Sequence, residues 1–369
     1  MSAYSYASSC VIPKQWVPLK LLAKRPVNHD TFLFDFALPA DAGAAATLRL
    51  PVCGCLMLCA RGREHASKGG GDAVRPYTPV SAPDTIGRFT LLVKVYQEWG
   101  DPQFAHSYRP AGAVSNFIAG LRPGIDSAEF CHLPQNVKLQ LPFPPETDAV
   151  GANGAVGMAD AAQHAGVRTV TMVAVGAGVA PMLQALELLL ARGSADHTRV
   201  VLLLGNRSVR DILMRERLEV WQRQHPARFK LVFVVGSRWT SGVRIGLARP
   251  EPPEGFKSLA HPRLIELAQE LQAQQERCTS DAARADVEAQ HFAEHREAFE
   301  TLRPQAELGW VNELVLRKHA FPPAPDTRVF VCGLPAVYDN LCGPRGDAAL
   351  REGSALQRLG YTTDMVVKF

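Results

Sequence analysis

Arg75-Pro76-Tyr77-Thr78 place a cation, a planar ring and a hydroxyl within one short run. Arg75 can donate a forked pair of hydrogen bonds to phosphate. Tyr77 can stack on a flat ring, Thr78 can hydrogen-bond its edge, and Pro76 restricts the backbone between them. This chemistry suits a flavin dinucleotide, which presents a pyrophosphate and a reactive ring. Taken alone, the run also describes a strand edge followed by a turn.

A second run, Val173 to Pro181, reads VAVGAGVAP. It predicts a strand, a glycine turn and a helix with Pro181 in its first turn, where proline is favoured. Gly176 and Gly178 would let a dinucleotide approach the backbone, and a helix N-terminus favours phosphate. The third glycine of the usual fingerprint is absent, so this run is a partial dinucleotide signature.

A third run, Cys332-Gly333-Leu334-Pro335, follows the apolar stretch Val329 to Val331. Ligands of open parallel sheets bind at the carboxyl ends of the strands, so Cys332 could face a nicotinamide ring. A buried structural thiol would explain the same residue.

Two different sequence patterns predict the elements that position these runs. Between Trp16 and Val137, short segments rich in β-branched and aromatic residues alternate with Gly, Pro and Asp clusters, which is typical of an antiparallel barrel. From Thr169 onward, buried strands alternate with helices, which indicates a parallel, doubly wound sheet. We predict a barrel over residues 14–145, a linker or surface excursion over 146–166, and an α/β domain over 167–369 with a helical insertion at about 240–306.

The composition supports a globular protein: 369 residues, 47% hydrophobic and 21% charged, are enough for about two domains. No apolar run approaches the roughly 18 residues that cross a bilayer, so no integral membrane segment is predicted. Residues 1–10 do not show a charged start followed by an apolar core, so we do not expect a secretory signal. The eight cysteines do not form a small disulfide scaffold, so we expect a reducing compartment, cytoplasmic or mitochondrial.

Two groups of residues could suggest a metal site. Cys53, Cys55 and Cys59 lie in an apolar run that we interpret as a core strand, because no Cys-x-x-Cys pair or nearby histidine completes a tetrahedral site. His291 and His295 match the H-x-x-E-H pattern of zinc peptidases, but they lie in the insertion without an evident third ligand. We therefore predict no metal.

The charge is unevenly distributed. Residues 251–307 contain 12 acidic and 6 basic side chains, a balance of −6, which leaves +10 on the rest of a chain whose net charge is +4. A basic body could attract an acidic protein or dinucleotide phosphates. Ordinary solvated surface explains it equally well, and no basic-aromatic repeat suggests nucleic acid.

In order along the chain, these runs resemble the NADH–cytochrome b5 reductase branch of the ferredoxin–NADP reductase superfamily. The resemblance extends from about Val17 to Phe369, apart from the insertion. The segments that carry it are RPYTPVS, FTLLVKVY, PMLQALELLL, GNRSVRDILMRERLE, ARFKL, GWVNE and VFVCG. It implies a barrel that binds FAD and a Rossmann-like domain that binds NADH or NADPH. It also implies a monomer that passes single electrons to a haem protein such as cytochrome b5.

The resemblance assigns site residues one by one. On the flavin side it implies Arg75, Pro76, Tyr77, Thr78, Val93, Lys94, Val95, Tyr96, Gly112, Val114 and Ser115. On the nicotinamide side it implies Gly176, Ala177, Gly178, Pro181, Cys332, Gly333 and the terminal Phe369. Thr78, near the ring nitrogen that accepts hydride, and Cys332, beside the nicotinamide, are the two expected catalytic residues. Lys94 would meet nicotinamide-cofactor charge, and Ser115 would cap the flavin pyrophosphate.

Five positions depart from the family pattern. Val175 replaces a glycine, Ala177 a threonine, Ala113 a lysine, Leu334 a proline and Cys55 a histidine. These changes bear on rate and flavin affinity more than on fold.

The position that selects the donor departs as well. NADH-specific members carry an acid after the strand that matches Phe229 to Val235, whereas this chain has Gly236, Ser237 and Arg238. Ser237 and Arg238 resemble the phosphate-binding pair of NADPH-using relatives, so we expect NADPH to be accepted. The alternatives are an NADPH-preferring reductase with another acceptor, or a low-activity reductase fold that serves as a binding module through its acidic insertion.

Overall fold

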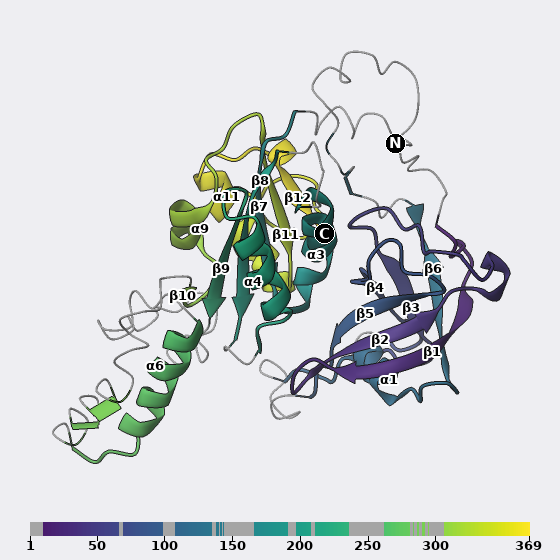
Figure 1. The fold of residues 1–369 in the computed structure, drawn as a ribbon, viewed down its shortest axis with the longest axis horizontal. Helices are drawn as coiled ribbons and strands as arrows, with labels where there is room; N and C mark the ends of the chain where they lie inside the picture. Colours follow the sequence, from purple (N-terminus) through teal and green to yellow (C-terminus); the bar gives the residue numbers. More distant parts are fainter. Residues whose placement is uncertain are drawn as a thin grey trace. The chain divides into compact units, whose positions relative to one another are not determined.

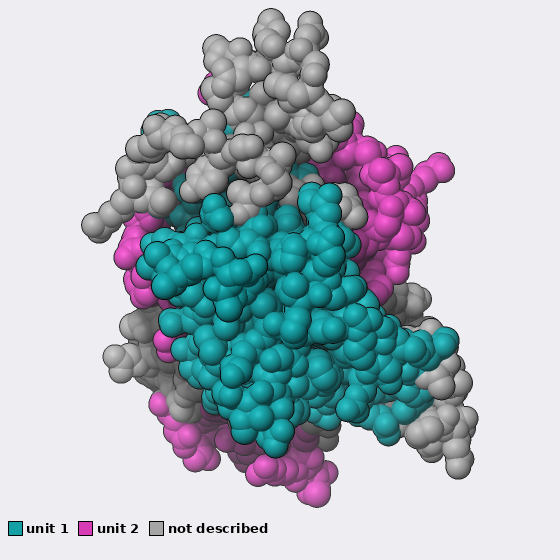
Figure 2. Space-filling model, turned by 90° about the vertical axis from the view of Figure 1, so that its right-hand side faces the viewer, with its two compact units in different colours: residues 1–167, 177–197, 369 teal, residues 168–176, 198–368 magenta. Residues whose placement is uncertain are grey.

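The structure is a computed structural model that divides into two compact units. Unit 1 comprises Met1–Val167, Ala177–His197 and Phe369, and unit 2 comprises Arg168–Gly176 and Thr198–Lys368 (Figure 2). The residues that the structure describes are 10–65, 69–98, 108–134, 138–139, 141, 143, 166–190, 197–207, 211–235, 262–280, 283, 286–287, 290–291, 294 and 306–369. The predicted domain limits remain predictions.

Unit 1 is built on a six-stranded antiparallel sheet with strand order β4-β3-β6-β1-β2-β5 (Figure 1). Its strands are β1 (Val17–Pro26), β2 (Thr31–Ala37), β3 (Leu56–Ala60), β4 (Ala73–Tyr77), β5 (Arg88–Lys94) and β6 (Ser127–His132), with α1 (Ala113–Gly120) between the last two. Beyond β4 the chain reaches β5, where Pro79 bridges Leu91 and the Val80 N–H donates to the Thr90 carbonyl at 2.8 Å. This contact joins the two edges of the sheet. All of its strand pairs are antiparallel, which confirms the predicted antiparallel architecture.

Alternation along the strands explains the core of unit 1. On β2, Phe34 and Phe36 point inward and are fully buried. The rings of Phe36, Phe89 and Phe130 pack together at centroid distances of 4.8 to 5.8 Å. Each such ring stabilises the fold by about 1.5–3 kcal/mol. Asp35 lies between them on the other face. It is nearly buried, and it accepts hydrogen bonds from Arg25 at 3.1 Å and from the Thr90 hydroxyl at 2.7 Å.

Unit 2 is built on a six-stranded parallel sheet with order β10-β9-β8-β7-β11-β12 (Figure 1). Its strands are β7 (Thr169–Val175), β8 (Arg199–Asn206), β9 (Phe229–Val235), β10 (Ala306–Leu308), β11 (Thr327–Cys332) and β12 (Val366–Lys368). Its helices include α4 (Arg215–Gln224), α9 (Glu313–His319), α10 (Pro335–Leu341) and α11 (Ala355–Arg358). The central strands are almost wholly buried, as expected for a parallel sheet, and the predicted α/β class is confirmed.

The strand order of unit 2 reverses next to β7. The chain first adds β8 and β9 on one side of β7, and later adds β11 and β12 on the other. A buried hydroxyl pair, Thr169 with Thr327 at 2.8 Å, ties β7 to β11. In open α/β sheets, ligands bind at the carboxyl ends of the strands that flank such a reversal. The edge formed by the ends of β7 and β11 is therefore the expected ligand site of this unit.

The predicted insertion contains at least one helix among the described residues, α6 (Pro262–Gln275), which buries Leu267 and Leu271. Its Glu266 lies 3.7 Å from the guanidinium of Arg215 on α4. The second predicted helix and His295 lie outside the described residues, as does most of the predicted linker. No helix within the described part of the chain has both the length and the apolar character of a membrane span.

Candidate flavin and dinucleotide sites

The flavin signature lies on the edge strand β4. Arg75, Pro76 and Tyr77 form its end, and Thr78 follows directly. Pro76 is tolerated because an edge strand can lack one ladder donor. Burial raises the pKa of Tyr77 above its usual range, so its phenol stays neutral and can stack or hydrogen-bond. The signature therefore presents a ring and a hydroxyl from a rigid strand.

Arg75 does not stand free at this edge. Its Nη2 donates to Glu64 Oε2 at 2.8 Å, and its Nη1 donates to the Val74 carbonyl at 2.7 Å. The Glu64 side chain is only 11% exposed, so the pair is partly shielded from water. The Glu64 carboxylate thus already neutralises much of the Arg75 charge that was predicted to bind a phosphate.

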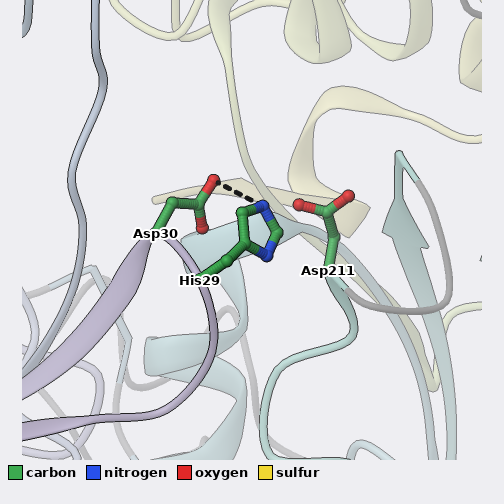
Figure 3. A group of neighbouring side chains, drawn as sticks. All are labelled: His29, Asp30 and Asp211. Atoms are coloured by element: carbon green, nitrogen blue, oxygen red, sulfur yellow. Dashed lines mark ion pairs between the residues drawn. The ribbon is translucent and has the colours of Figure 1, made fainter.

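Lys94 is also paired. Its Nζ lies 2.6 Å from Asp30 Oδ2. Asp30 also pairs with the ring of His29 (Figure 3), and the two groups are 3.4 Å apart. The side chains of Val93 and Val95, on either side of Lys94, are buried in the core. Lys94 therefore anchors the end of β5, and its predicted role toward the nicotinamide cofactor remains a prediction.

The first turn of α1 is tied to Tyr96, just beyond β5. The Ser115 hydroxyl donates to the Gly112 carbonyl at 3.1 Å and accepts from the Tyr96 N–H at 3.3 Å. Asn116 Nδ2 donates to the carbonyls of Tyr96, at 2.8 Å, and Gly112, at 2.9 Å. A Cβ on Gly112 would lie 2.5 Å from Ser115 Oγ, so the close turn requires glycine. Val114 is buried beneath this turn.

A cavity of about 450 Å³ opens beside this turn. Its lining residues are Arg63, His65, Ala111, Gly112, Ala113, Asn116, Phe117, Gly120 and Leu121. The first amides of a helix have no intrahelical acceptor, and together with the helix dipole they favour an anion. The volume lies in the range of small-molecule sites. The donor set and the size fit the phosphate and adenylate portion of FAD.

In unit 2, Gly176 and Cys332 lie at the ends of β7 and β11. Cys332 is opposite Ala174 in the ladder, and Gly176 turns the chain with φ 55°. Gly333 packs closely against β7 and α10, because an added Cβ would be 3.2 Å from Val175 Cβ and 3.2 Å from Val337 Cγ2. The reversal of strand order thus brings two predicted motifs, which are far apart in sequence, to one edge.

Tyr338 on α10 contacts both residues of the late motif. The Gly333 N–H donates to its hydroxyl at 3.3 Å, and that hydroxyl also hydrogen-bonds Cys332. Burial, followed by the nearby Cys332, raises the pKa of Tyr338 above its usual range. The phenol therefore keeps its proton and can donate to the Cys332 sulfur. The sequence analysis missed Tyr338, whose only signal was its place one helical turn after Pro335.

The remaining dinucleotide residues continue along the chain. Ala177 and Gly178 lie in the short 3-10 turn η5 (Gly176–Gly178), and α3 (Val179–Leu190) follows with Pro181 near its start. Phe369 is buried after β12. Ser237 and Arg238 lie outside the described residues.

The interpretation of the early cysteines as one continuous core strand was wrong. The strand begins at Leu56, so only Cys59 belongs to it, and Cys53 occupies a left-handed turn with φ 61°. The Cys53 thiol donates to the Pro181 carbonyl at 3.2 Å, and its N–H donates to Gln184 Oε1 at 2.7 Å. Local apolar composition could not reveal this turn, because its conformation is secured by partners more than a hundred residues away. Within the described residues, no possible metal-ligand group includes a cysteine.

Comparison with known proteins agrees with this geometry. The oxidoreductase FAD-binding domain family matches residues 18–129, and the oxidoreductase NAD-binding domain family matches residues 172–245. NADH-cytochrome b5 reductase 3 of Rattus norvegicus is 35% identical over 95% of this chain and 86% of its own length. The NADH nitrate reductase of Lotus japonicus is 31% identical over 61% of this chain, which spans only 22% of that enzyme.

Among solved structures, the cytochrome b5 reductase domain of Ulva prolifera nitrate reductase superposes with a TM-score of 0.62 at 20% identity, covering 98% of this chain and 100% of that domain. This likeness supports the fold. The extent of the match to the rat enzyme shows that the chain belongs to the NADH–cytochrome b5 reductase family of oxidoreductases, with an FAD-binding and an NAD-binding domain.

Proposed function

We propose that this protein transfers hydride from a nicotinamide dinucleotide to FAD and then delivers single electrons to a haem protein of the cytochrome b5 type. The observation that carries the proposal is the placement of Gly176 and Cys332 at the strand-order reversal of unit 2. When bound, FAD supplies the chemistry of hydride acceptance and one-electron release. The side chains then have to bind, orient and exclude water, and none has to act as a general acid or base.

The residue roles follow from this proposal. Tyr77 and Thr78 would contact the flavin ring, and the first turn of α1 would bind the flavin phosphates. Cys332, oriented by the Tyr338 hydroxyl, would contact the nicotinamide. The backbone of Gly176 would approach the dinucleotide, as its left-handed conformation permits.

The identity of the donor is part of the proposal. Ser237 and Arg238 follow β9 in sequence, where an acid would repel the additional phosphate of NADPH. We expect NADPH to be used with an efficiency within about tenfold of that for NADH, a difference of about 1.4 kcal/mol. Arg238→Ala should lower the efficiency with NADPH and leave that with NADH nearly unchanged. A strong NADH preference that persists in Arg238→Ala would contradict this assignment.

The acceptor can be tested through charge. The body of the chain outside residues 251–307 carries +10, and complementary charges mainly accelerate encounter between partners. Raising ionic strength should therefore increase the apparent KM for an acidic haem protein such as cytochrome b5, because salt screens exposed charges. A KM that does not change with salt would remove the electrostatic argument for this acceptor.

The decisive experiment follows the absorption spectrum of the purified protein. We expect a flavin spectrum that bleaches on anaerobic addition of NADH or NADPH and returns when oxidised cytochrome b5 is added, with reduction of the haem. A flavin that bleaches without haem reduction would keep the reductase and reject the acceptor. Protein that binds no flavin would instead favour a binding module. A monomeric state also remains a prediction.

A further inference from the structure

The loop between β3 and β4 is built around its own hydrogen bonds. The Gly62 N–H donates to Asp72 Oδ1 at 2.8 Å, the Glu64 N–H to the Gly71 carbonyl at 2.9 Å, and the Gly70 N–H to the His65 carbonyl at 3.3 Å. The backbone positions of residues 62–65 are thus defined by the paired stem of a hairpin. Side chains on this stem have a fixed starting direction.

Three consecutive side chains on the stem have different surroundings. Glu64 reaches Arg75, whereas Arg63 and His65 line the cavity beside α1. This arrangement agrees with the alternation of side chains along an extended chain. The loop therefore neutralises the Arg75 cation with one residue and brings two basic residues to the cavity with its neighbours.

The charge balance of the cavity favours an anion. The described lining includes Arg63 and His65 and no acidic residue. The first turn of α1, from Ala113 to Asn116, carries no charged side chain of its own. A pyrophosphate at this turn would thus meet helix amides and the two basic residues of the loop, while Arg75 stays engaged by Glu64. Guanidinium and phosphate form strong, charge-assisted hydrogen bonds.

We propose that Arg63 and His65 bind the phosphate and adenylate half of FAD, with Arg63 supplying the positive charge that the first turn of α1 lacks and His65 supplying a hydrogen bond. The inference rests on the proposed assignment of the flavin to this unit. It adds a loop of the barrel to the flavin site and predicts which half of the cofactor this loop recognises. The flavin ring itself would be unaffected by the two side chains.

Binding of three ligands to flavin-free protein tests the proposal by fluorescence titration: FAD, riboflavin, which lacks phosphate and adenylate, and ADP as a competitor of FAD. Arg63→Ala should weaken FAD binding about 10- to 100-fold, as expected when a charged hydrogen bond is lost, and His65→Ala should weaken it less. Riboflavin binding should not change. ADP should compete with FAD in the wild type and less well in Arg63→Ala.

Two further variants control the experiment. Arg88→Ala removes an exposed arginine at the start of β5, away from the cavity lining, and should leave all three affinities unchanged. Adding Ala113→Lys to Arg63→Ala places a new cation on the first turn of α1, beside the cavity, and should recover most of the FAD affinity. Circular dichroism and thermal unfolding should show each variant folded, as expected because Arg63 is exposed.

The outcomes separate the inference from the proposed function. Unchanged FAD affinity in both loop variants would overturn the inference and leave the reductase intact. An equal loss of FAD and riboflavin would also overturn it, because the loop would then act on the fold of the site. A wild-type protein that binds neither flavin would overturn the proposed function itself.

Discussion

The two sheets bring their site residues together by different means. In unit 2, Gly176 and Cys332 are neighbours because β7 and β11 are adjacent parallel strands whose carboxyl ends share one edge. In unit 1, the antiparallel strands and α1 do not end at one shared edge. Side-chain hydrogen bonds, such as those of Ser115 and Glu64, hold its site segments next to one another. Unit 2 should therefore be sensitive to backbone shape at this shared edge, and unit 1 to the loss of individual polar contacts.

The largest expected effect tests backbone shape in unit 2. Gly333→Val should lower the rate of flavin reduction by NADH or NADPH at least about 100-fold, because small misplacements at a reacting centre can cost that much. Its side chain would collide with Val175 and Val337. Stopped-flow absorbance measures the rate, and FAD content should remain normal.

Gly346→Val is the matched control, since nothing lies within 4 Å of a Cβ at that glycine. It should reduce at the wild-type rate. If Gly333→Val were equally fast, the close packing at Gly333 would not be what flavin reduction requires.

The next effect tests polar contacts in unit 1. Ser115→Ala removes a donor to Gly112 and an acceptor for Tyr96, and should lower the free energy of unfolding by about 1–2 kcal/mol. FAD affinity should fall with it, because the first turn of α1 loses its attachment. Denaturant unfolding and flavin titration measure the two effects. Ser127→Ala, at an exposed position on β6, should change neither.

A smaller effect is expected from Tyr338→Phe, which removes the hydroxyl shared by Gly333 and Cys332. We expect a loss of about 1 kcal/mol, seen as a rate of flavin reduction about fivefold lower with little change in KM for the nicotinamide donor. In a Cys332→Ala background the same change should have almost no further effect on the rate. Additive losses would show that Tyr338 acts on packing and not through Cys332.

The smallest effect concerns an edge of the parallel sheet. Burial alone would raise the pKa of Glu307 on β10, but hydrogen bonds from His319, at 2.8 Å, and Lys318 lower it overall. A carboxyl pKa that is lowered by folding contributes stability above the unfolded pKa of about 4.3, and this stability disappears as pH falls through the folded value. The free energy of unfolding of Glu307→Gln should be about 0.5–1 kcal/mol lower than that of the wild type at neutral pH. Between about pH 5 and 3 it should change less with pH than in the wild type.

This last variant also sharpens the comparison. If Glu307→Gln cost as much as Ser115→Ala, unit 2 would depend on side-chain contacts as strongly as unit 1. The contrast between the two sheets would then fail.

Some parts of the site could be predicted from the sequence because their signals are local. The strand, glycine turn and helix around Gly176 follow from a short run, and the apolar stretch before Cys332 predicts a strand end. The conformation of the early cysteine run was predicted wrongly, because it depends on distant contacts. Its apolar letters favour a strand, but contacts from Pro181 and Gln184 accompany a left-handed turn at Cys53.

Long-range pairing decided the chemistry of the predicted cations. Nothing near Arg75 or Lys94 in the motif indicates that Glu64 and Asp30 would engage them, because those carboxylates arrive through the hairpin and the neighbouring strand. In the same way, the placement of Arg63 beside α1 depends on segments about fifty residues apart in sequence. A motif specifies side-chain types, but it does not state which of their charges are already neutralised.

By itself, the sequence determined the two architectures, their order and the three motifs, since periodicity, glycine and proline act over a few residues. The tertiary structure decided which basic residues face the cavity, that Tyr338 contacts Cys332, and that Gly176 and Cys332 share one edge. The physical reason is that hydrogen bonds, ion pairs and close packing depend on distance in space, and only the folded chain brings distant residues within that range.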